Sequence, residues 1–185
     1  MILSVIFLII SALISIAGIW YIIRSFIKTF ITKEAPFVSS PPNTAQQLAR
    51  HIFIPPGGVV YDLGCGDGRL LRALYEKFPQ ATYLGIEHEY IPYLLFRWRN
   101  RHIPQKHLSI KKENFKKTDI SSATHILTYL FPHIMDALLP KFEKELKPGA
   151  LVISVDFAFS NKQPKEIIEL ETHMARGKRL YVYEF

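Results

Sequence analysis

The chain opens with an apolar stretch, residues 1–23, in which no side chain is charged. A helix rises about 1.5 Å per residue, so this stretch can cross a hydrocarbon core about 30 Å thick. Trp20 and Tyr21 close it where interfacial aromatic residues belong, and basic residues follow from Arg24 onward. The pattern predicts a transmembrane anchor whose C-terminal side lies in the cytoplasm.

A cleaved signal peptide and an extra-long buried helix of a soluble domain are the alternative interpretations of this stretch, and the missing polar face argues against the buried helix. Signal peptides place their charges before a shorter apolar core, whereas here the charges follow a long one. We therefore favour an uncleaved, single-pass anchor in the cell membrane. Residues 24–43 are predicted to be a juxtamembrane segment and a linker, because their prolines interrupt a helix. Residues 44–185 are predicted to form the folded domain.

Within 44–185, short apolar runs alternate with segments of helical period, as in an α/β fold with a parallel sheet. Strands are predicted at 59–63, 81–86, 108–112, 125–130 and 151–159, followed by an antiparallel hairpin of 167–173 and 179–185. Helices are predicted from a cap at Asn43 or Thr44 to residue 52, and over 69–78, 91–101 and 133–146. Lysines in the third strand predict that it lies at an edge. The fold class is therefore α/β, with a Rossmann-like sheet of seven strands that ends in the hairpin.

Three glycines at alternate positions, Gly64, Gly66 and Gly68, follow the first strand and precede a helix. Glycine permits positive φ and lets a backbone approach a ligand closely. A strand, a glycine loop and a helix N-terminus in succession form a nucleotide-binding unit. A tight turn without a ligand is the alternative, but such a turn has no need of three glycines.

The charges of this loop indicate which nucleotide it binds. Asp62 and Asp67 stand where the pyrophosphate of NAD would lie, and Arg69 takes the place of the third glycine of the dinucleotide fingerprint. Acidic residues repel a pyrophosphate and suit a ligand with a positively charged sulfonium and amino group. Cys65, the one cysteine of the chain, lies in the same loop, so neither an intramolecular disulfide nor a zinc cluster is expected.

A further acid, Glu87, ends the second predicted strand. In a βαβ unit an acid at this position faces the ribose hydroxyls of the ligand and accepts hydrogen bonds from both. The alternative is a solvated surface glutamate.

The run from Asp62 to Arg69 resembles motif I of the class I S-adenosylmethionine (SAM) methyltransferases. Together with the anchor, the linker and stretches 129–132, 141–149 and 155–157, it makes nearly the whole chain similar to the membrane-anchored protein-lysine methyltransferases. That family includes the methyltransferases of the ATP synthase c subunit and the adenine nucleotide translocase, with bacterial and archaeal relatives. In this chain we find no long insertion where a substrate is usually chosen.

The resemblance implies SAM as the cofactor. Its expected binding residues are Asp62, Gly64, Cys65, Gly66, Asp67, Gly68 and Glu87. Asn114 follows the third strand, where this fold often meets the adenine amino group; an asparagine of a turn is the alternative. No metal is expected, because the histidines show no metal-binding spacing.

The resemblance also implies transfer of a methyl group to a lysine of a membrane or membrane-proximal protein. Such an in-line displacement needs positioning rather than a nucleophile–base pair. Tyr129 and Phe131, at the mouth of the fourth strand, are candidates for the aromatic walls that hold a cationic amine. Asp156, at the end of the fifth strand, is the candidate that orients it. Core packing of the two aromatic residues and a structural hydrogen bond of Asp156 are the alternatives.

The formal net charge of +7 predicts an anionic neighbour. The sequence shows no basic stripe with interleaved aromatic residues, so lipid headgroups are expected rather than nucleic acid. Two other functions stay open: a methyltransferase for a small molecule or lipid at the membrane, and a non-catalytic SAM-binding module.

Overall fold

The computed structural model describes residues 2–30, 40–172 and 175–185. The chain divides into two compact units, Met1–Pro36 and Phe37–Phe185. Most of the predicted linker, residues 31–39, lies outside the described residues.

The described part of the first unit is one helix, α1 (Ile2–Phe30). Its stretch Ile2–Ile23 has 22 residues, none of them buried, and is by length and composition able to cross a membrane. The helix runs on to Phe30 without a break, because no proline or charged cluster interrupts it, and so includes the first part of the predicted juxtamembrane segment.

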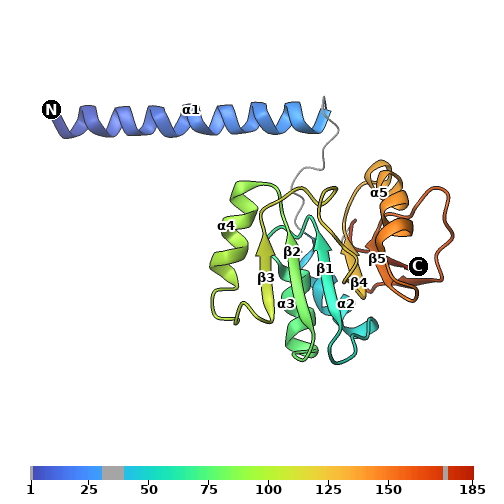
Figure 1. Ribbon diagram of the computed structural model, residues 1–185. Helices are drawn as coiled ribbons and strands as arrows, with labels where there is room; N and C mark the ends of the chain where they lie inside the picture. The colour runs from blue at the N-terminus through green and yellow to red at the C-terminus, as the bar shows by residue number, and fades with distance from the viewer. Residues whose placement is uncertain (1, 31–39, 173–174) are drawn as a thin grey trace. The chain divides into compact units, whose positions relative to one another are not determined.

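The second unit contains one sheet of seven strands. These are β1 (Val59–Leu63), β2 (Thr82–Ile86), β3 (Leu108–Lys111), β4 (His125–Thr128), β5 (Leu151–Val155), β6 (Glu166–Glu169) and β7 (Arg179–Glu184). Their order across the sheet is β3-β2-β1-β4-β5-β7-β6 (Figure 1). The first five strands are parallel, and β7 pairs antiparallel with both β5 and β6. The predicted fold class, the hairpin and the edge position of β3 are confirmed.

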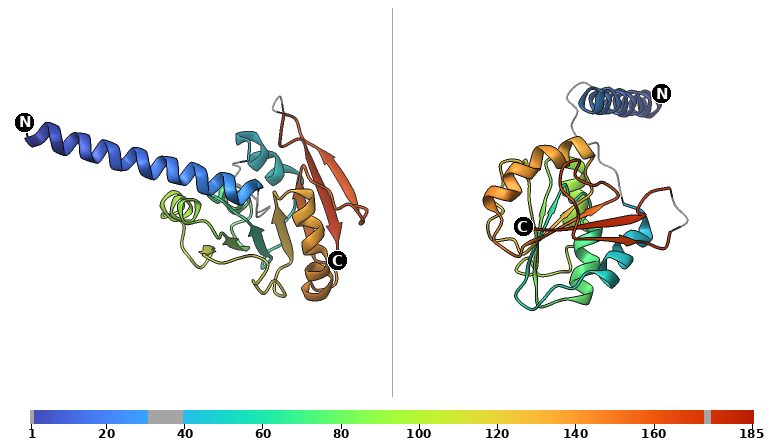
Figure 2. Two further views of the ribbon diagram at one scale, coloured as in Figure 1. Left: turned by 90° about the horizontal axis from the view of Figure 1, so that it is seen from above. Right: turned by 90° about the vertical axis from the view of Figure 1, so that its right-hand side faces the viewer.

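Four helices accompany this sheet: α2 (Pro42–His51), α3 (Arg69–Lys77), α4 (Tyr90–Arg99) and α5 (Pro132–Glu145). From β1 the chain builds the sheet outward in one direction to β3, and from β4 it builds in the other direction. Because parallel crossovers are right-handed, α3 and α4 cover one face and α5 covers the opposite face (Figure 2). The direction reverses between β1 and β4, and ligands of such sheets bind outside the carboxyl ends of the strands at this switch point.

The core fills both faces of the central strands. Leu63, Ile126 and Leu127 are fully buried, and each such aliphatic side chain stabilises the fold by about 1.5–3 kcal/mol. Tyr83 is also fully buried, and its hydroxyl oxygen lies 3.1 Å and 2.9 Å from the carbonyl oxygens of Leu74 and Phe78, to which it can donate. The burial of both apolar and hydrogen-bonded groups makes the sheet a rigid base for the loops at its carboxyl edge.

Several predicted boundaries are wrong: β4 ends at Thr128 rather than at residue 130, β6 ends at Glu169 rather than at residue 173, and the start of α2 and the end of β5 also differ. Helix α2 begins at Pro42 with Pro41 as its N-cap and no side-chain cap, so neither Asn43 nor Thr44 caps it. Proline suits the first helical position because its φ is already helical and it has no N–H to satisfy there. Strand β5 ends at Val155, short of the predicted residue 159, because Asp156 has φ 62° and turns the chain away from the sheet.

Candidate cofactor and acceptor site

The loop between β1 and α3 turns three times through the left-handed region. Gly64, Gly66 and Gly68 have φ of 81°, 57° and 75°, a conformation that residues with a Cβ rarely adopt. The backbone N–H groups of Gly64 and Cys65 both donate to the carbonyl oxygen of Ile86, at 2.8 Å and 3.1 Å. The loop is therefore fastened to the end of β2, and the predicted glycine turn is present in the structure.

The glycines of the loop have different neighbours. A Cβ added at Gly64 would meet only the Leu130 side chain, at 3.4 Å. At Gly68 it would overlap the ring of Phe96, and at Gly85 of β2 it would lie 2.5 Å from the sulfur of Cys65. Space for a ligand is thus left at Gly64, whereas Gly68 lets α4 pack closely on the loop.

Asp62, the fourth residue of β1, is 2% exposed, and its Oδ2 has no hydrogen-bond partner among the described residues. Burial, with the charges of Glu87 and Asp67, raises the pKa of this carboxyl to about 8. A buried oxygen without a partner is costly unless a ligand satisfies it. Asp62 is therefore placed to accept a hydrogen bond from a cationic ligand.

Glu87 holds the loop from the end of β2. It is 7% exposed; its Oε2 accepts from the N–H of Gly66 at 3.0 Å, and its Oε1 accepts from the N–H of Glu89 at 2.8 Å. Burial raises the pKa of Glu87, although these backbone hydrogen bonds oppose the rise. Each carboxylate oxygen has a second lone pair, so Glu87 can still accept from a ligand. It is not a solvated surface glutamate.

The carboxylate of Asp67 is paired with two guanidinium groups. Arg69 contacts it at 2.9 Å from Nη2, and Arg99 of α4 forms a second ion pair with it. Burial acts to raise the pKa of Asp67, but the hydrogen bonds and charge of Arg69 and the charge of Arg99 hold it below its ordinary value. The charge of Asp67 is therefore already paired within the protein, whereas Asp62 has no cationic partner of this kind in the part of the chain that the structure describes.

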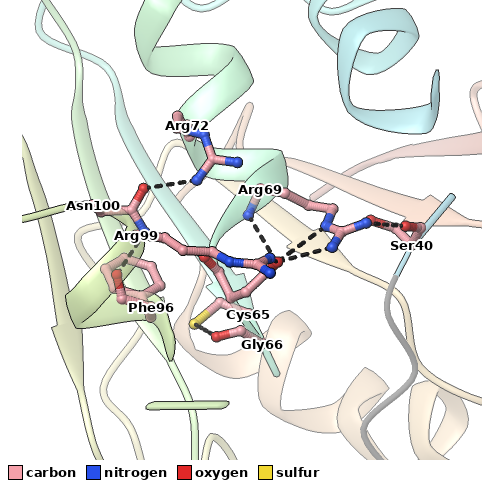
Figure 3. Close-up of polar contacts among 9 residues, drawn as sticks. Ser40, Cys65, Gly66, Arg69, Arg72, Phe96, Arg99 and Asn100 are labelled. Atoms are coloured by element: carbon pink, nitrogen blue, oxygen red, sulfur yellow. Dashed lines mark hydrogen bonds and ion pairs between the residues drawn. The ribbon is translucent and has the colours of Figure 1, made fainter. Parts of the chain in front are cut away.

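The same cluster joins three parts of the unit. Arg69 Nη1 donates to the carbonyl oxygen of Ser40 at 2.7 Å, so the residues that precede α2 are tied to the loop. Asn100 donates to the carbonyl oxygens of Asp67 and Phe96, at 3.2 Å and 2.8 Å. The glycine loop is thus held by α4 on one side and by the start of the unit on the other (Figure 3).

Asn114 lies beyond β3, in a turn. Its Oδ1 accepts from the N–H of Lys116 at 3.0 Å. This is the hydrogen bond expected of an asparagine that stabilises its own turn.

Three aromatic side chains gather beyond the carboxyl ends of β4 and β5. The ring of Phe157 stacks on Tyr129 at 5.8 Å and meets Phe131 edge-on at 5.5 Å. All three rings are half-buried. Burial, and after it the charge of Asp156, raises the pKa of the Tyr129 hydroxyl. The sequence-based interpretation did not name Phe157 among the candidate residues, although Phe157 directly follows Asp156 in the chain.

Asp156 fastens the turn that precedes β7. Its Oδ2 accepts from the N–H of Gly177 at 2.5 Å, and its Oδ1 accepts from Lys178 and Arg179 at 2.6 Å and 3.2 Å. A carboxylate that collects three backbone hydrogen bonds has a structural role of its own. It also lies near Tyr129, since its charge contributes to the raised pKa of that hydroxyl.

The arrangement fits SAM on its own chemistry. An unpartnered buried carboxylate, a glycine with open space beside it and a second acid at the end of β2 meet at the switch point of the sheet. Among the described residues, no group of three or more histidine, cysteine or acidic side chains could hold a metal ion. Fold and site together define a class I SAM-dependent methyltransferase.

Comparison with known proteins gives the family. Residues 62–166 match the model of the ANTKMT methyltransferase domain, and the chain belongs to this family. It is 35% identical over 152 residues to a protein-lysine N-methyltransferase of Saccharolobus islandicus, a match that covers 80% of this chain and 94% of that protein. It is 30% identical to the Xenopus laevis lysine N-methyltransferase of the ATP synthase c subunit, covering 60% of this chain and 48% of the relative.

A solved structure gives the same class. The RNA methyltransferase of Salinibacter ruber in complex with S-adenosyl-L-homocysteine superposes with a TM-score of 0.71 at 26% sequence identity, over 80% of this chain and 93% of that one. The predicted SAM cofactor and the predicted protein-lysine methyltransferase family are confirmed, and the membrane anchor stays a prediction.

Proposed function

We propose that this methyltransferase acts on a lysine side chain of a membrane or membrane-proximal protein. The aromatic cluster of Tyr129, Phe131 and Phe157 carries the proposal, because rings of this kind hold a cationic amine. The likeness to the lysine methyltransferase of Saccharolobus islandicus supports it. We propose the domain boundaries as 1–23 for the anchor, 24–43 for the juxtamembrane segment and linker, and 44–185 for the catalytic domain.

The cofactor half of the site is proposed to comprise Asp62, Gly64, Cys65, Gly66, Asp67, Gly68, Glu87 and Asn114. When bound, SAM would supply a methyl group to the lone pair of an amine, and its sulfonium sulfur would leave as a neutral thioether. Asp62 is proposed to accept from the amino group of the ligand, and Glu87 from its ribose hydroxyls. Asp67 is proposed to act indirectly rather than by contacting the ligand, because its carboxylate already forms ion pairs with Arg69 and Arg99.

The acceptor half is proposed to comprise Tyr129, Phe131, Phe157 and Asp156. A lysine must lose a proton from a reference pKa of about 10.4 before it can react. Removal of water from the ammonium group in a half-buried site favours that loss, whereas attraction of the cation to the rings opposes it. The Tyr129 hydroxyl, near the carboxylate of Asp156, is proposed to help orient the amine.

Transfer of label from methyl-tritiated SAM to a membrane extract tests the substrate class. We expect label that survives lipid extraction and nuclease, is released by protease and appears as methyllysine on hydrolysis. Label in lipid would favour the small-molecule alternative. Label in RNA would indicate that this chain methylates RNA, the substrate class in the name of the Salinibacter ruber methyltransferase. No label in any fraction would favour a non-catalytic SAM-binding module.

The variant Glu87→Ala is the matched control for this assay. It removes the acceptor of the Gly66 N–H and the proposed acceptor of the ribose hydroxyls. We expect SAM binding to weaken by about 1–3 kcal/mol in calorimetry, and labelling to fall at subsaturating SAM. The wild-type protein should bind SAM and not NAD. Unchanged SAM affinity in Glu87→Ala would remove Glu87 from the cofactor site.

A further inference from the structure

One face of α4 is apolar and exposed. Ile91, Leu94 and Trp98 lie at helical spacings of three, four and seven, so they share a face. They are 49%, 43% and 62% exposed, and Tyr90 beside them is also exposed. A contiguous exposed patch of large apolar side chains marks an interaction site in a folded domain.

The opposite face of α4 accounts for its packing. Pro92, Phe96 and Asn100 follow one another at spacings of four and are buried. Phe96 packs on the glycine loop, and Asn100 donates to it. The apolar exposed face therefore does not serve the core of the unit Phe37–Phe185.

Basic side chains border this face and contact its aromatic rings. Lys112, which follows β3, lies 4.9 Å above the ring of Tyr90, and Arg101 lies 5.4 Å from the ring of Trp98. Arg97 lies 5.9 Å from the ring of Tyr93. The surface formed by α4, Arg101 and Lys112 is called the α4 surface below. It combines an apolar strip with cations at its border, the pattern of helices that lie in a membrane interface.

We propose that the α4 surface docks on an anionic lipid bilayer. Its cations match lipid phosphates in charge, and its apolar strip matches the boundary of the acyl chains. Ile91 and Leu94 occupy the middle of the strip, and aliphatic side chains there offer nucleic acid neither stacking nor hydrogen bonds. This assignment concerns a contact separate from α1 and does not rest on the lysine substrate.

The length of the chain permits such a contact alongside an inserted α1. Between Phe30 and Ser40 the connection can reach at most about 35 Å. A bilayer contact by the second unit is then an intramolecular event, favoured by a high effective concentration.

Trp98 reports directly on this contact. The chain has two tryptophans, Trp20 and Trp98, so full-length protein with Trp20→Phe has one emitter, on the α4 surface. This protein is reconstituted at one chain per lipid nanodisc, in neutral phosphatidylcholine or with phosphatidylglycerol added. We expect a blue shift of Trp98 emission in the anionic discs, and at least twofold stronger quenching there by lipids brominated near the headgroup.

Charge-reversal variants test the role of the basic border. The double variant Arg97→Glu, Lys112→Glu spares Arg101, whose contact with Trp98 would alter the fluorescence directly. We expect it to lose the anionic preference. Lys144→Glu, an exposed lysine of α5, reverses a charge elsewhere and should leave quenching unchanged. SAM affinity, measured on each variant, reports that the fold is intact.

Three results would overturn the assignment. Absence of quenching in both kinds of disc would remove lipid as the partner. Equal quenching in neutral and anionic discs would show that the contact does not depend on anionic headgroups. Protection of Trp98 from an aqueous quencher that requires added RNA, or two chains per disc, would assign the α4 surface to nucleic acid or to a second copy.

Discussion

At the scale of single residues, Asp62 is the group that the fold alone leaves least satisfied. Its pKa of about 8 means that it is largely protonated at neutral pH when no ligand is bound. A cationic amino group beside it favours the ionised form and lowers that pKa. We therefore predict that SAM binding at pH 7 releases about one proton. Calorimetry in buffers of different ionisation enthalpy measures this number directly.

The sign of the pH dependence follows from the same shift. SAM affinity should rise as the pH increases toward about 8 and level off above it, where Asp62 is already ionised. Asp62→Asn should bind SAM more weakly and abolish the linked proton. Without ligand, this variant should gain stability relative to wild type as the pH rises from 4 toward 8, because ionisation of the buried Asp62 opposes folding in that range. Proton release that persists in Asp62→Asn would assign the proton to another group.

At the scale of elements, Asp156 joins the end of β5 to the turn before β7. Replacing Asp156 with alanine leaves three backbone N–H groups without their acceptor. Alanine also tolerates the positive φ of 62° at this position less well than aspartate does. We predict a loss of about 1–3 kcal/mol in the free energy of unfolding for Asp156→Ala, measured by denaturant titration. Asp156→Asn keeps one acceptor oxygen and tolerates positive φ, and it should lose less.

The two variants also separate the structural role of Asp156 from its proposed role in orienting the amine. If Asp156→Asn keeps its stability but loses kcat with a lysine peptide, the orienting role stands. If kcat and stability fall together in both variants, the hydrogen bonds to the turn account for the whole effect.

Local patterns predicted most elements of the sheet, and long-range contacts explain where prediction failed. The glycine turns and Glu87 could be found because loop, strand end and βαβ order lie within one stretch of chain. Phe157 could not, because its position depends on the positive φ of Asp156, which is fixed by backbone groups of residues 177–179.

Pairings across elements were equally hidden in the sequence. Arg99 neutralises Asp67 from a different helix, so the loop appeared more acidic than it is. Lys112 meets Tyr90 from the end of another strand. Tertiary structure thus assembles the α4 surface from α4 and from residues that follow α4 and β3, so no local run of the sequence displays it.

At the scale of the whole molecule, the N-terminal helix should govern access to the substrate rather than binding of SAM. We predict that removal of residues 1–33 leaves SAM affinity unchanged, because the glycine loop and Glu87 belong to the unit Phe37–Phe185. Methylation of a membrane-embedded substrate should fall by at least about tenfold, and methylation of a peptide copy much less, because effective concentration is lost.

Equal rates on the embedded substrate, at equal enzyme concentration, would mean that the helix does not deliver the enzyme to its target. Topology is checked separately by adding protease to intact cells. The second unit should be protected if it lies in the cytoplasm, and a mature protein that begins after Ile23 would identify the helix as a cleaved signal.

The single cysteine, Cys65, can report how often the cofactor loop opens. Burial, with the charges of Asp62 and Glu87, raises the pKa of the Cys65 thiol, and its buried sulfur lies close to Gly85. A maleimide reagent can reach it only when the loop opens, so the labelling rate of native protein should be far below that of unfolded protein. Saturating SAM should slow it further, and labelling as fast as in a free peptide would contradict the buried position. Because the sequence contains no other thiol, the increase in protein mass over time gives the labelling rate of Cys65, and so reports loop opening, without any mutation.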